Sequence, residues 1–245
     1  MDNNVPSHVV KMWTPLKRNI DEKYNFLPTN IIFKVCSFFI RIFAIIVLSI
    51  YNKIVFGLKV KGREKIKHLK GKAYVSICNH VNFLDCTMVA CALKEYSLYQ
   101  PTLKDNFNIP IVGRLVRILG GIPIPQSVKG VNIFNKVVSE ILNSNKVVHF
   151  FPEGVLIPYD KGIRNFKRGA FKCAYDNNVP IVPMVIKYRK PTGIHRIFKK
   201  KPCITIKILD PVFPDKDKSC KEESSFLMEN CYEKMKSVIF HDCNA

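Results

Sequence analysis

The amino-acid sequence predicts an α/β protein built on a mostly parallel mixed sheet with helices packed on it. Three observations support this fold class: apolar runs of strand length recur along the chain, segments of helical periodicity separate them, and a long apolar segment precedes them all. Strands that alternate with helices are typical of α/β folds. A length of 245 residues suffices for one large domain with a substantial core. We expect a helical segment over residues 1–53 and the α/β domain over residues 54–245.

The individual elements follow from composition and periodicity. Strand-like runs cover residues 54–60, 73–78, 122–124, 146–151, 181–188 and 203–209. Helical periodicity covers residues 127–142, 167–176 and 222–240, and a shorter helix is expected to begin near Asn82. In the first of these helices one face carries Val131, Phe134, Val138, Ile141 and Leu142, and in the last the expected apolar positions include Phe226, Leu227 and Met235.

The N-terminal segment turns apolar after Asn30, a good helix N-cap, and stays so to residue 50. On a helix, its polar residues form one narrow stripe: Lys34, Ser37, Arg41, Ser49 and Lys53. Such a helix suits a membrane interface, with its cations reaching the headgroups, and Trp13 and Tyr24 are candidate interfacial anchors. A helix that spans the membrane is the second alternative, but it would place Arg41 near mid-bilayer at a free-energy cost of about 3 kcal/mol. A buried helix of a soluble core is the third alternative. We favour membrane association.

The charge balance indicates anionic partners. The 39 basic and 19 acidic residues give a net charge of +20, which suits nucleic acid, an anionic membrane face or phosphorylated substrates. The nine cysteines are scattered without Cys-x-x-Cys spacing, and Cys36, Cys78 and Cys173 lie in apolar runs. We therefore expect small buried thiols in a reducing compartment, and we expect no metal site.

A candidate base lies where the strand over residues 73–78 ends. His80 follows that strand, and Asp85 is placed for the first turn of the next helix, with Asn82 as its expected N-cap. A carboxylate there is stabilised by the helix dipole and orients an imidazole that takes a proton. By itself this spacing also fits an ordinary hydrogen-bonded histidine at a strand end.

Two further segments carry candidate ligand-binding residues. Glu153 and Gly154 follow a buried-type strand in Phe151-Pro152-Glu153-Gly154, at the sheet edge where α/β proteins hold ligands. The cations that come next are Arg164, Lys167 and Arg168, and guanidinium groups bind phosphate well. The alternative is a turn followed by a helix with a solvated basic face.

Four ordered blocks together resemble the glycerolipid acyltransferases, and most closely the bacterial 1-acyl-sn-glycerol-3-phosphate acyltransferases. The blocks are Asn79-His80…Asp85, Gly113 with Gly121-Ile122-Pro123-Ile124, Phe151-Pro152-Glu153-Gly154 and Val179-Pro180-Ile181-Val182-Pro183, within residues 54–210. The resemblance implies an α/β acyltransferase domain at a membrane surface, on the cytoplasmic face. It implies transfer of a fatty acyl group from acyl-CoA or acyl carrier protein, as co-substrate, to lysophosphatidic acid, without a cofactor.

The resemblance also implies roles for single residues. His80 matches the general base and Asp85 the acid that orients it. Glu153 and Gly154 match the block associated with the acyl acceptor, and Lys104 lies where a cation precedes the second block. Two arginines of the family pattern are missing, because Val155-Leu156-Ile157 follow Gly154 and Gln126 ends the second block. We expect Arg164, Lys167 and Arg168 to supply the missing charge.

Three alternatives remain open from the sequence. The first is an acyltransferase whose acceptor is glycerol 3-phosphate or another lysophospholipid. The second is a basic nucleic-acid-binding protein, and the third is a catalytically silent membrane-binding scaffold. The sequence has no recognition-helix, zinc-finger or RNA-binding aromatic motif, which disfavours nucleic acid as a partner. The basic loop over residues 189–201 fits headgroups, coenzyme A phosphates, an acidic carrier protein or plain solvent equally well.

Overall fold

The computed structural model describes residues 24–28, 30–95 and 97–241. The candidate anchor Trp13 lies outside this range. The strands are β1 (Lys59–Lys61), β2 (Tyr74–Cys78), β3 (Leu98–Leu103), β4 (Gly121–Ile124), β5 (Val147–Phe150), β6 (Ile181–Arg189) and β7 (Cys203–Ile208). The helices are α1 (Ile31–Val55), α2 (Asp85–Leu93), α3 (Lys104–Phe107), α4 (Val112–Ile118), α5 (Val128–Asn143), α6 (Gly169–Asp176), α7 (His195–Phe198) and α8 (Cys220–His241), with a 3-10 helix η1 (Arg63–Leu69).

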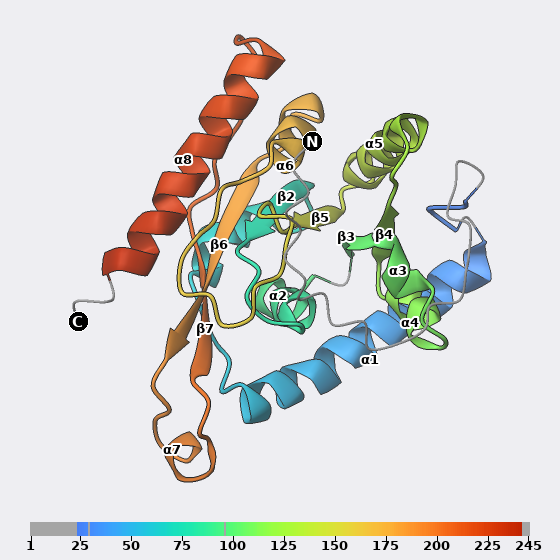
Figure 1. The fold of residues 1–245 in the computed structure, drawn as a ribbon. Coiled ribbons are helices and arrows are strands. Elements are labelled where there is room, and N and C mark those ends of the chain that lie inside the picture. The colour runs from blue at the N-terminus through green and yellow to red at the C-terminus, as the bar shows by residue number, and fades with distance from the viewer. Residues whose placement is uncertain (1–23, 29, 96, 242–245) are drawn as a thin grey trace.

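One seven-stranded sheet, ordered β1-β7-β6-β2-β5-β3-β4, organises the molecule. Neighbouring strands run parallel except β6 and β7, which pair antiparallel, so the expected mostly parallel mixed sheet is confirmed. Alternate side chains of β2 serve two cores: Val75 and Ile77 join the cluster under α5, α6 and α8, whereas Tyr74 and Cys78 join the cluster that includes α2. Figure 1 shows these helices on opposite sides of the sheet.

Some element boundaries differ from those expected. The strand expected from residue 54 begins at Lys59, because α1 continues to Val55. Strand β3 was missed, since Pro101 lies within it. That proline is tolerated because β3 pairs with β5 only at Leu98 and Tyr99 and with β4 beyond them. The short helices α3, α4 and α7 were also not predicted, because four to seven residues carry too little periodicity.

The three longer helices expected within the α/β domain are present, with two side-chain corrections. Ser127 caps α5, its hydroxyl accepting from the Gly130 amide at 3.0 Å. Val131 in α5 and Phe226 in α8 are exposed rather than turned inward. The division into residues 1–53 and 54–245 stays a prediction.

Helix α1 is amphipathic in the inverted sense: three of its polar side chains are buried against the protein, Lys34 and Lys53 are exposed, and most of its large apolar side chains face outward. The expected N-cap is confirmed, with Asn30 Oδ1 accepting from the Ile32 amide at 2.8 Å. Ser37, Arg41 and Asn52 are buried. The exposed apolar side chains are Ile31, Ile32, Val35, Phe38, Phe39, Ile40, Phe43, Ile46, Val47, Ile50, Tyr51, Ile54 and Val55.

The inward polar face corrects the expectation that the whole stripe reaches the headgroups. Ser37 Oγ and Arg41 Nε donate to the carbonyl oxygen of Ile118, at 2.6 and 2.8 Å, and so attach α1 to the end of α4. Cys36 on the outer face is exposed, not buried as expected. Among the described helices, α1 is the one long and apolar enough to cross a membrane by length and composition, and almost none of it is buried in the protein.

Candidate active site

The carboxyl ends of four parallel strands bring the candidate site residues to one edge of the sheet. His80 follows β2, Glu153 follows β5, Lys104 follows β3 and Gln126 follows β4. Parallel strands end at the same edge, which is where open α/β sheets hold ligands. Because β2 and β5 are adjacent, His80 and Glu153 become neighbours, while Lys104 lies two strands away from β2.

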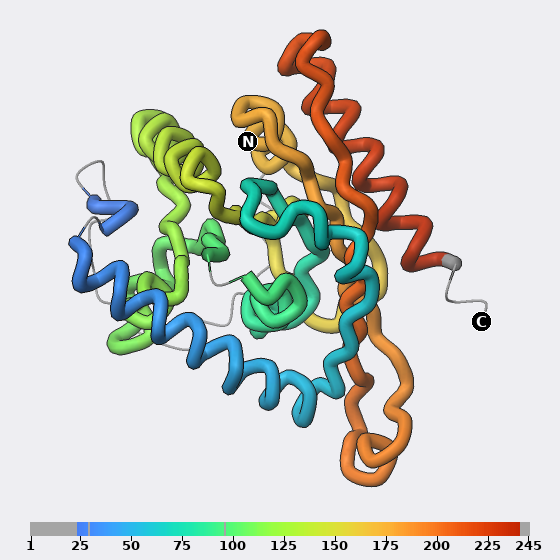
Figure 2. The backbone as a smooth tube through the Cα atoms, turned by 180° about the vertical axis from the view of Figure 1, so that it is seen from behind, coloured from blue at the N-terminus to red at the C-terminus, as the bar shows by residue number. Residues whose placement is uncertain are grey.

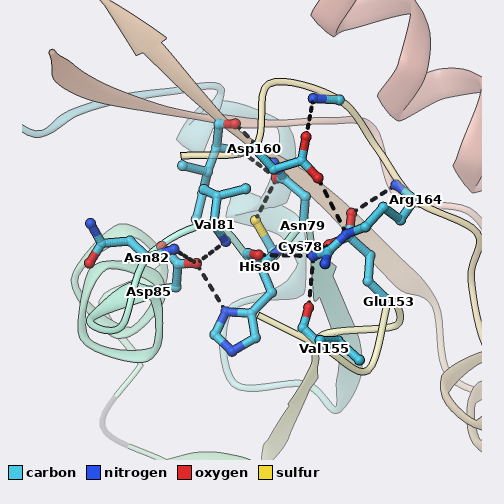
Figure 3. A network of polar contacts seen from close by, with 12 residues as sticks. Cys78, Asn79, His80, Val81, Asn82, Asp85, Glu153, Val155, Asp160 and Arg164 are labelled. Carbon is cyan, nitrogen blue, oxygen red and sulfur yellow. Dashed lines mark hydrogen bonds and ion pairs between the residues drawn. The ribbon is translucent and has the colours of Figure 1, made fainter. Parts of the chain in front are cut away.

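The imidazole of His80 is held by the carboxylate of Asp85. Nδ1 of His80 lies 3.0 Å from Oδ2 of Asp85, and the same oxygen accepts from the amides of Val81 at 2.6 Å and Asn82 at 2.8 Å. Asp85 is fully buried, whereas the side chain of His80 is 23% exposed. In Figure 3 the second ring nitrogen, Nε2, points away from Asp85. A carboxylate only accepts, so Nδ1 carries a proton, and in the neutral ring Nε2 then has the free lone pair.

The turn between His80 and α2 differs in detail from the expected capping box. Helix α2 begins at Asp85 and Leu84 occupies the N-cap position without a side-chain bond, so Asn82 is not the N-cap. The acid half of the box still forms, because Asp85 accepts from the Asn82 amide three residues back. The expected position of Asp85 in the first turn of the helix is confirmed.

Neighbouring strands fix the backbone around His80. The buried side chain of Asn79 bonds β6 like another strand residue, accepting from the Ile186 amide at 2.7 Å and donating to its carbonyl oxygen at 3.0 Å. The Tyr188 hydroxyl donates to the carbonyl oxygen of Val81 at 2.9 Å. Burial and the negative charge of Asp85 raise the pKa of Tyr188, so its phenol stays a proton donor.

Glu153 and Arg164 form a partly buried ion pair that holds His80 through its main chain. Glu153 Oε2 accepts from the His80 amide at 3.1 Å and from the Arg164 guanidinium, and Oε1 accepts from the Arg164 amide at 3.1 Å. Arg164 Nη2 also donates to the carbonyl oxygens of His80 at 3.0 Å and Val155 at 2.7 Å. With its side chain 1% exposed, Glu153 is placed to position His80. Direct contact of Glu153 with substrate stays a prediction.

The three cations expected near Gly154 have different surroundings. Arg164 turns inward to Glu153, and Arg168 donates through Nη2 to Lys221 and Ser224 of α8. Phosphate binding by either guanidinium stays a prediction. Lys167 lies over Gly154, where an added Cβ would meet its stem and ammonium. The Lys167 ammonium makes no ion pair or hydrogen bond with the described residues.

The second block supplies one further cation. The ammonium of Lys104 donates to the side-chain oxygen of Gln126, which stands where the family pattern has an arginine. The ends of β3 and β4 thus place an amine and an amide together instead of two cations. Of the two cations that the family pattern has at the ends of these strands, Lys104 is the one present here.

A second histidine, His149, which the sequence did not single out, contacts the same aromatic ring as His80. The ring of Phe151 stacks on His80 with centroids 3.9 Å apart and meets His149 edge-on at 4.6 Å. His149 Nδ1 lies 2.9 Å from the Ser76 hydroxyl. Burial and the neighbouring His80 lower the pKa of His149 to about 3. His149 lies on β5, which pairs with β2, the strand that precedes His80. Knowing that these two strands are neighbours would have placed His149 near the site.

Metal ligands do not cluster in the part of the chain that the structure describes. Within it, no group of three or more His, Cys, Asp or Glu side chains is arranged to hold an ion. The expectation of a protein without a resident metal or cofactor stays a prediction.

The sequence matches the family model for acyltransferases over residues 57–187, more than half of the chain. This chain belongs to the acyltransferase family. The predicted resemblance is confirmed, and the matched range of this acyltransferase includes His80, Asp85, Lys104, Glu153 and Arg164.

Individual relatives match part of the chain at low sequence identity. The 1-acyl-sn-glycerol-3-phosphate acyltransferase of Saccharomyces cerevisiae is 26% identical over 172 residues, covering 65% of this acyltransferase and 54% of the yeast protein. The Haemophilus influenzae protein of the same name is 29% identical over 132 residues, covering 53% and 54%. The acyltransferase therefore spans about half the length of the curated relatives it matches.

A solved structure has the same fold. The crystal structure of the 1-acyl-sn-glycerophosphate acyltransferase PlsC from Thermotoga maritima superposes with a TM-score of 0.62 at 21% identity, covering 87% of this acyltransferase and 88% of that chain. The similarity extends beyond residues 57–187 and confirms the fold class.

Proposed function

We propose that this protein transfers a fatty acyl group from an acyl thioester to the free hydroxyl of lysophosphatidic acid, giving phosphatidic acid. The observation that supports it most is the His80–Asp85 pair, at 3.0 Å, with the outer ring nitrogen open at the carboxyl edge of a sheet of the acyltransferase family. The names of the yeast and Haemophilus relatives support the choice of acceptor.

The proposed reaction needs one base and no covalent enzyme intermediate. Nε2 of His80 takes the proton of the acceptor hydroxyl as its oxygen attacks the thioester carbonyl, and Asp85 stabilises the imidazolium that forms. The tetrahedral intermediate expels the thiolate, which receives the proton from His80. Acyl-CoA or acyl carrier protein is the co-substrate, and no further cofactor takes part.

The acceptor phosphate is proposed to meet Lys167 and Lys104 rather than all the cations expected from the sequence. Arg164 and Arg168 are engaged with Glu153 and α8, whereas the Lys167 ammonium has no partner in the described residues. Gly154 has φ +70° and no side chain, which lets the stem of Lys167 lie directly over the backbone beside Glu153.

Membrane association is proposed through the outer face of α1. Thirteen of its apolar side chains are exposed, while its buried polar side chains attach it to α4 and α2. Burying apolar side chains in lipid is favourable at about 0.8 kcal/mol per CH₂ group, and the net charge of +20 favours an anionic leaflet such as the cytoplasmic face.

An acceptor panel tests the proposed reaction. Purified protein is given a labelled acyl-CoA or acyl carrier protein with lysophosphatidic acid, glycerol 3-phosphate or lysophosphatidylcholine. We expect lysophosphatidic acid to have the highest kcat/KM, and His80→Ala to lower kcat by about 10²- to 10⁴-fold. His68→Ala, at an exposed position of η1, is the matched control with unchanged turnover.

Each other outcome points to one of the alternatives. Preference for another acceptor would reassign the substrate but keep the chemistry. No turnover with any acceptor, while the protein binds vesicles, would indicate a scaffold, and salt-sensitive binding to nucleic acid without lipid binding would indicate a nucleic-acid-binding protein.

Substitutions at two neighbouring cations test the acceptor site. Lys167→Gln should raise the KM for lysophosphatidic acid about tenfold with little change in kcat, because a charged hydrogen bond is worth about 1.5 kcal/mol or more. Arg168→Gln should leave this KM unchanged, since Arg168 bonds α8. Equal effects of the two substitutions would mean that neither contact is specific.

A further inference from the structure

The connection between β6 and β7 projects from the body of the protein and ends in an exposed apolar tip. We refer to residues 190–202, which include α7, as the α7 hairpin. Ile194, Ile197 and Phe198 are 68%, 86% and 57% exposed. Three large apolar side chains at the end of a projecting turn are unfavourable in water, and clusters of this kind mark contact sites.

The α7 hairpin is also strongly basic. It contains no Asp or Glu, and its cations are Lys190, Arg196, Lys199, Lys200 and Lys201. Lys201 lies over the ring of Tyr159, 5.6 Å from its centroid, whereas Lys190, Arg196 and Lys200 are exposed. Apolar side chains flanked by cations, with no acid among them, match the interface of an anionic bilayer, where hydrocarbon lies beneath negative headgroups.

The base of the α7 hairpin is attached to the end of α1. His195 Nε2 lies 3.1 Å from the carbonyl oxygens of both Lys53 and Ile54, in the last turn of α1, and so donates to carbonyls that the helix leaves unpaired. Arg189, just before the hairpin, donates to the carbonyl oxygen of Gly57. The hairpin is therefore oriented by the helix that carries the outward apolar face.

Both views place the two elements on the same side of the molecule. In Figures 1 and 2 the α7 hairpin forms the lowest point, next to the C-terminal half of α1, while α5, α6 and the start of α8 lie at the opposite end. The α7 hairpin thus lies on the side of the molecule along which α1 runs.

We propose that the α7 hairpin is a second membrane contact, which inserts Ile194, Ile197 and Phe198 into an anionic bilayer while its cations bind lipid phosphates. Two contacts fix the orientation of a protein on a membrane, whereas α1 alone leaves it free to rotate about the helix axis. The inference rests on the proposed membrane location but not on acyl transfer, and binding without substrate tests it separately.

A tryptophan placed at the tip reports insertion directly. Trp13 is the sole tryptophan of the chain, so Trp13→Phe combined with Ile197→Trp leaves one fluorophore on the hairpin. Vesicles of phosphatidylglycerol with brominated acyl chains should shift its emission to the blue and quench it.

The matched control is Trp13→Phe with Phe213→Trp. Phe213 is 61% exposed and follows Val212, which pairs with the start of β6 at the end remote from the hairpin. This tryptophan should be neither shifted nor quenched. No quenching at residue 197, or equal quenching at both positions, would overturn the proposal.

Charge neutralisation tests the basic part of the contact. Lys190→Gln/Lys200→Gln should weaken binding to phosphatidylglycerol vesicles at least tenfold, since each cation near an anionic surface contributes about 1 kcal/mol. Lys129→Gln/Lys136→Gln, which removes two exposed cations of α5, should change it much less.

Activity in detergent micelles separates a different partner from a membrane. If the hairpin substitutions leave vesicle binding intact but lower turnover only with an acyl carrier protein as donor, the hairpin binds that acidic protein instead and the membrane proposal is wrong. If vesicle contact is lost while turnover in micelles persists, the proposal holds whatever the acceptor is.

Discussion

Two histidines near adjacent strands contact the ring of Phe151, and they differ in the features on which the proposed role of His80 as a base rests. His80 is 23% exposed and its Nδ1 is held by a buried carboxylate. His149 is 1% exposed, its Nδ1 faces the Ser76 hydroxyl, and its Nε2 is buried without a hydrogen-bond partner among the described residues. The pKa of His149 is lowered to about 3 by burial and by His80.

The difference bears on the proposed role of His80, because a place near the end of a strand does not by itself make an imidazole a base. Both residues come from parallel strands of one sheet, and both contact the same aromatic ring. What separates them is a carboxylate that stabilises the protonated ring and an outer nitrogen that solvent or substrate reaches. The four predictions below remove these features or measure them, beginning with the largest expected effect.

Replacing Asp85, the carboxylate partner of His80, should have the largest effect on turnover. In Asp85→Asn, a side chain that no longer carries charge cannot stabilise the imidazolium, and its amide favours the wrong tautomer of His80. We expect kcat to fall about 10²- to 10⁴-fold with the KM for lysophosphatidic acid nearly unchanged. Steady-state kinetics measure this, with the exposed Asp217→Asn as control. Wild-type turnover in Asp85→Asn would falsify the assigned roles.

Removing the partly buried ion pair tests how firmly His80 is held. Glu153→Ala removes the carboxylate that pairs with the Arg164 guanidinium and the acceptor of the His80 amide, which should lower the free energy of unfolding by about 3 kcal/mol. In the fraction that stays folded, kcat should fall while KM changes little, and Glu153→Gln should recover part of it. Denaturant unfolding and kinetics measure the two effects.

Glu140→Ala, at an exposed position of α5, is the control for that experiment. A larger effect of Glu153→Ala on KM than on kcat would instead support direct contact with the acceptor.

The buried histidine makes stability depend on pH. His149 stays neutral in the folded protein down to about pH 3, but in the unfolded chain it takes a proton near pH 6.5. The unfolded state therefore binds more protons between these values, and stability falls as the pH decreases below 6.5, by about 1.4 kcal/mol per unit for this group.

The variant His149→Asn removes this contribution. Its free energy of unfolding should fall less steeply than that of the wild type from pH 6.5 to pH 5, as measured by urea unfolding across that range. Parallel slopes for the two proteins would show that His149 is protonated in the folded state as well.

The shared aromatic ring should have the smallest effect. Phe151→Leu keeps an apolar side chain but removes the stacking on His80, and aromatic pairs contribute about 0.5 to 1.5 kcal/mol beyond their area. We expect kcat to fall about threefold, with a small loss of stability, measured in the same assays. A loss as large as that in Asp85→Asn would assign the ring a larger role than packing.

Several features were predictable from local sequence. The Asn30 and Ser127 caps, the apolar face of α6 and the strand-like runs of β2, β5, β6 and β7 depend on residues close together in the chain. The short helices around β3 and the strand itself were not predictable, because Pro101 and the few apolar positions there give no clear period.

The cations show why the rest of the site was not predictable. Arg164, Lys167 and Arg168 lie within five residues and look equivalent in the sequence. In the fold one pairs with Glu153, one lies over Gly154 and one reaches α8. Charge alone does not say which partner a long side chain meets when that partner is far away in the chain.

The sequence by itself determined the fold class, the membership in the family and the His80–Asp85 pair, since alternating periodicities and a five-residue spacing depend only on local geometry. The tertiary structure alone decided that Arg41 turns into the protein, that Glu153 holds the backbone of His80, and that His149 is buried. These depend on which strands and helices become neighbours, and burial is a property of the assembled molecule rather than of any one segment.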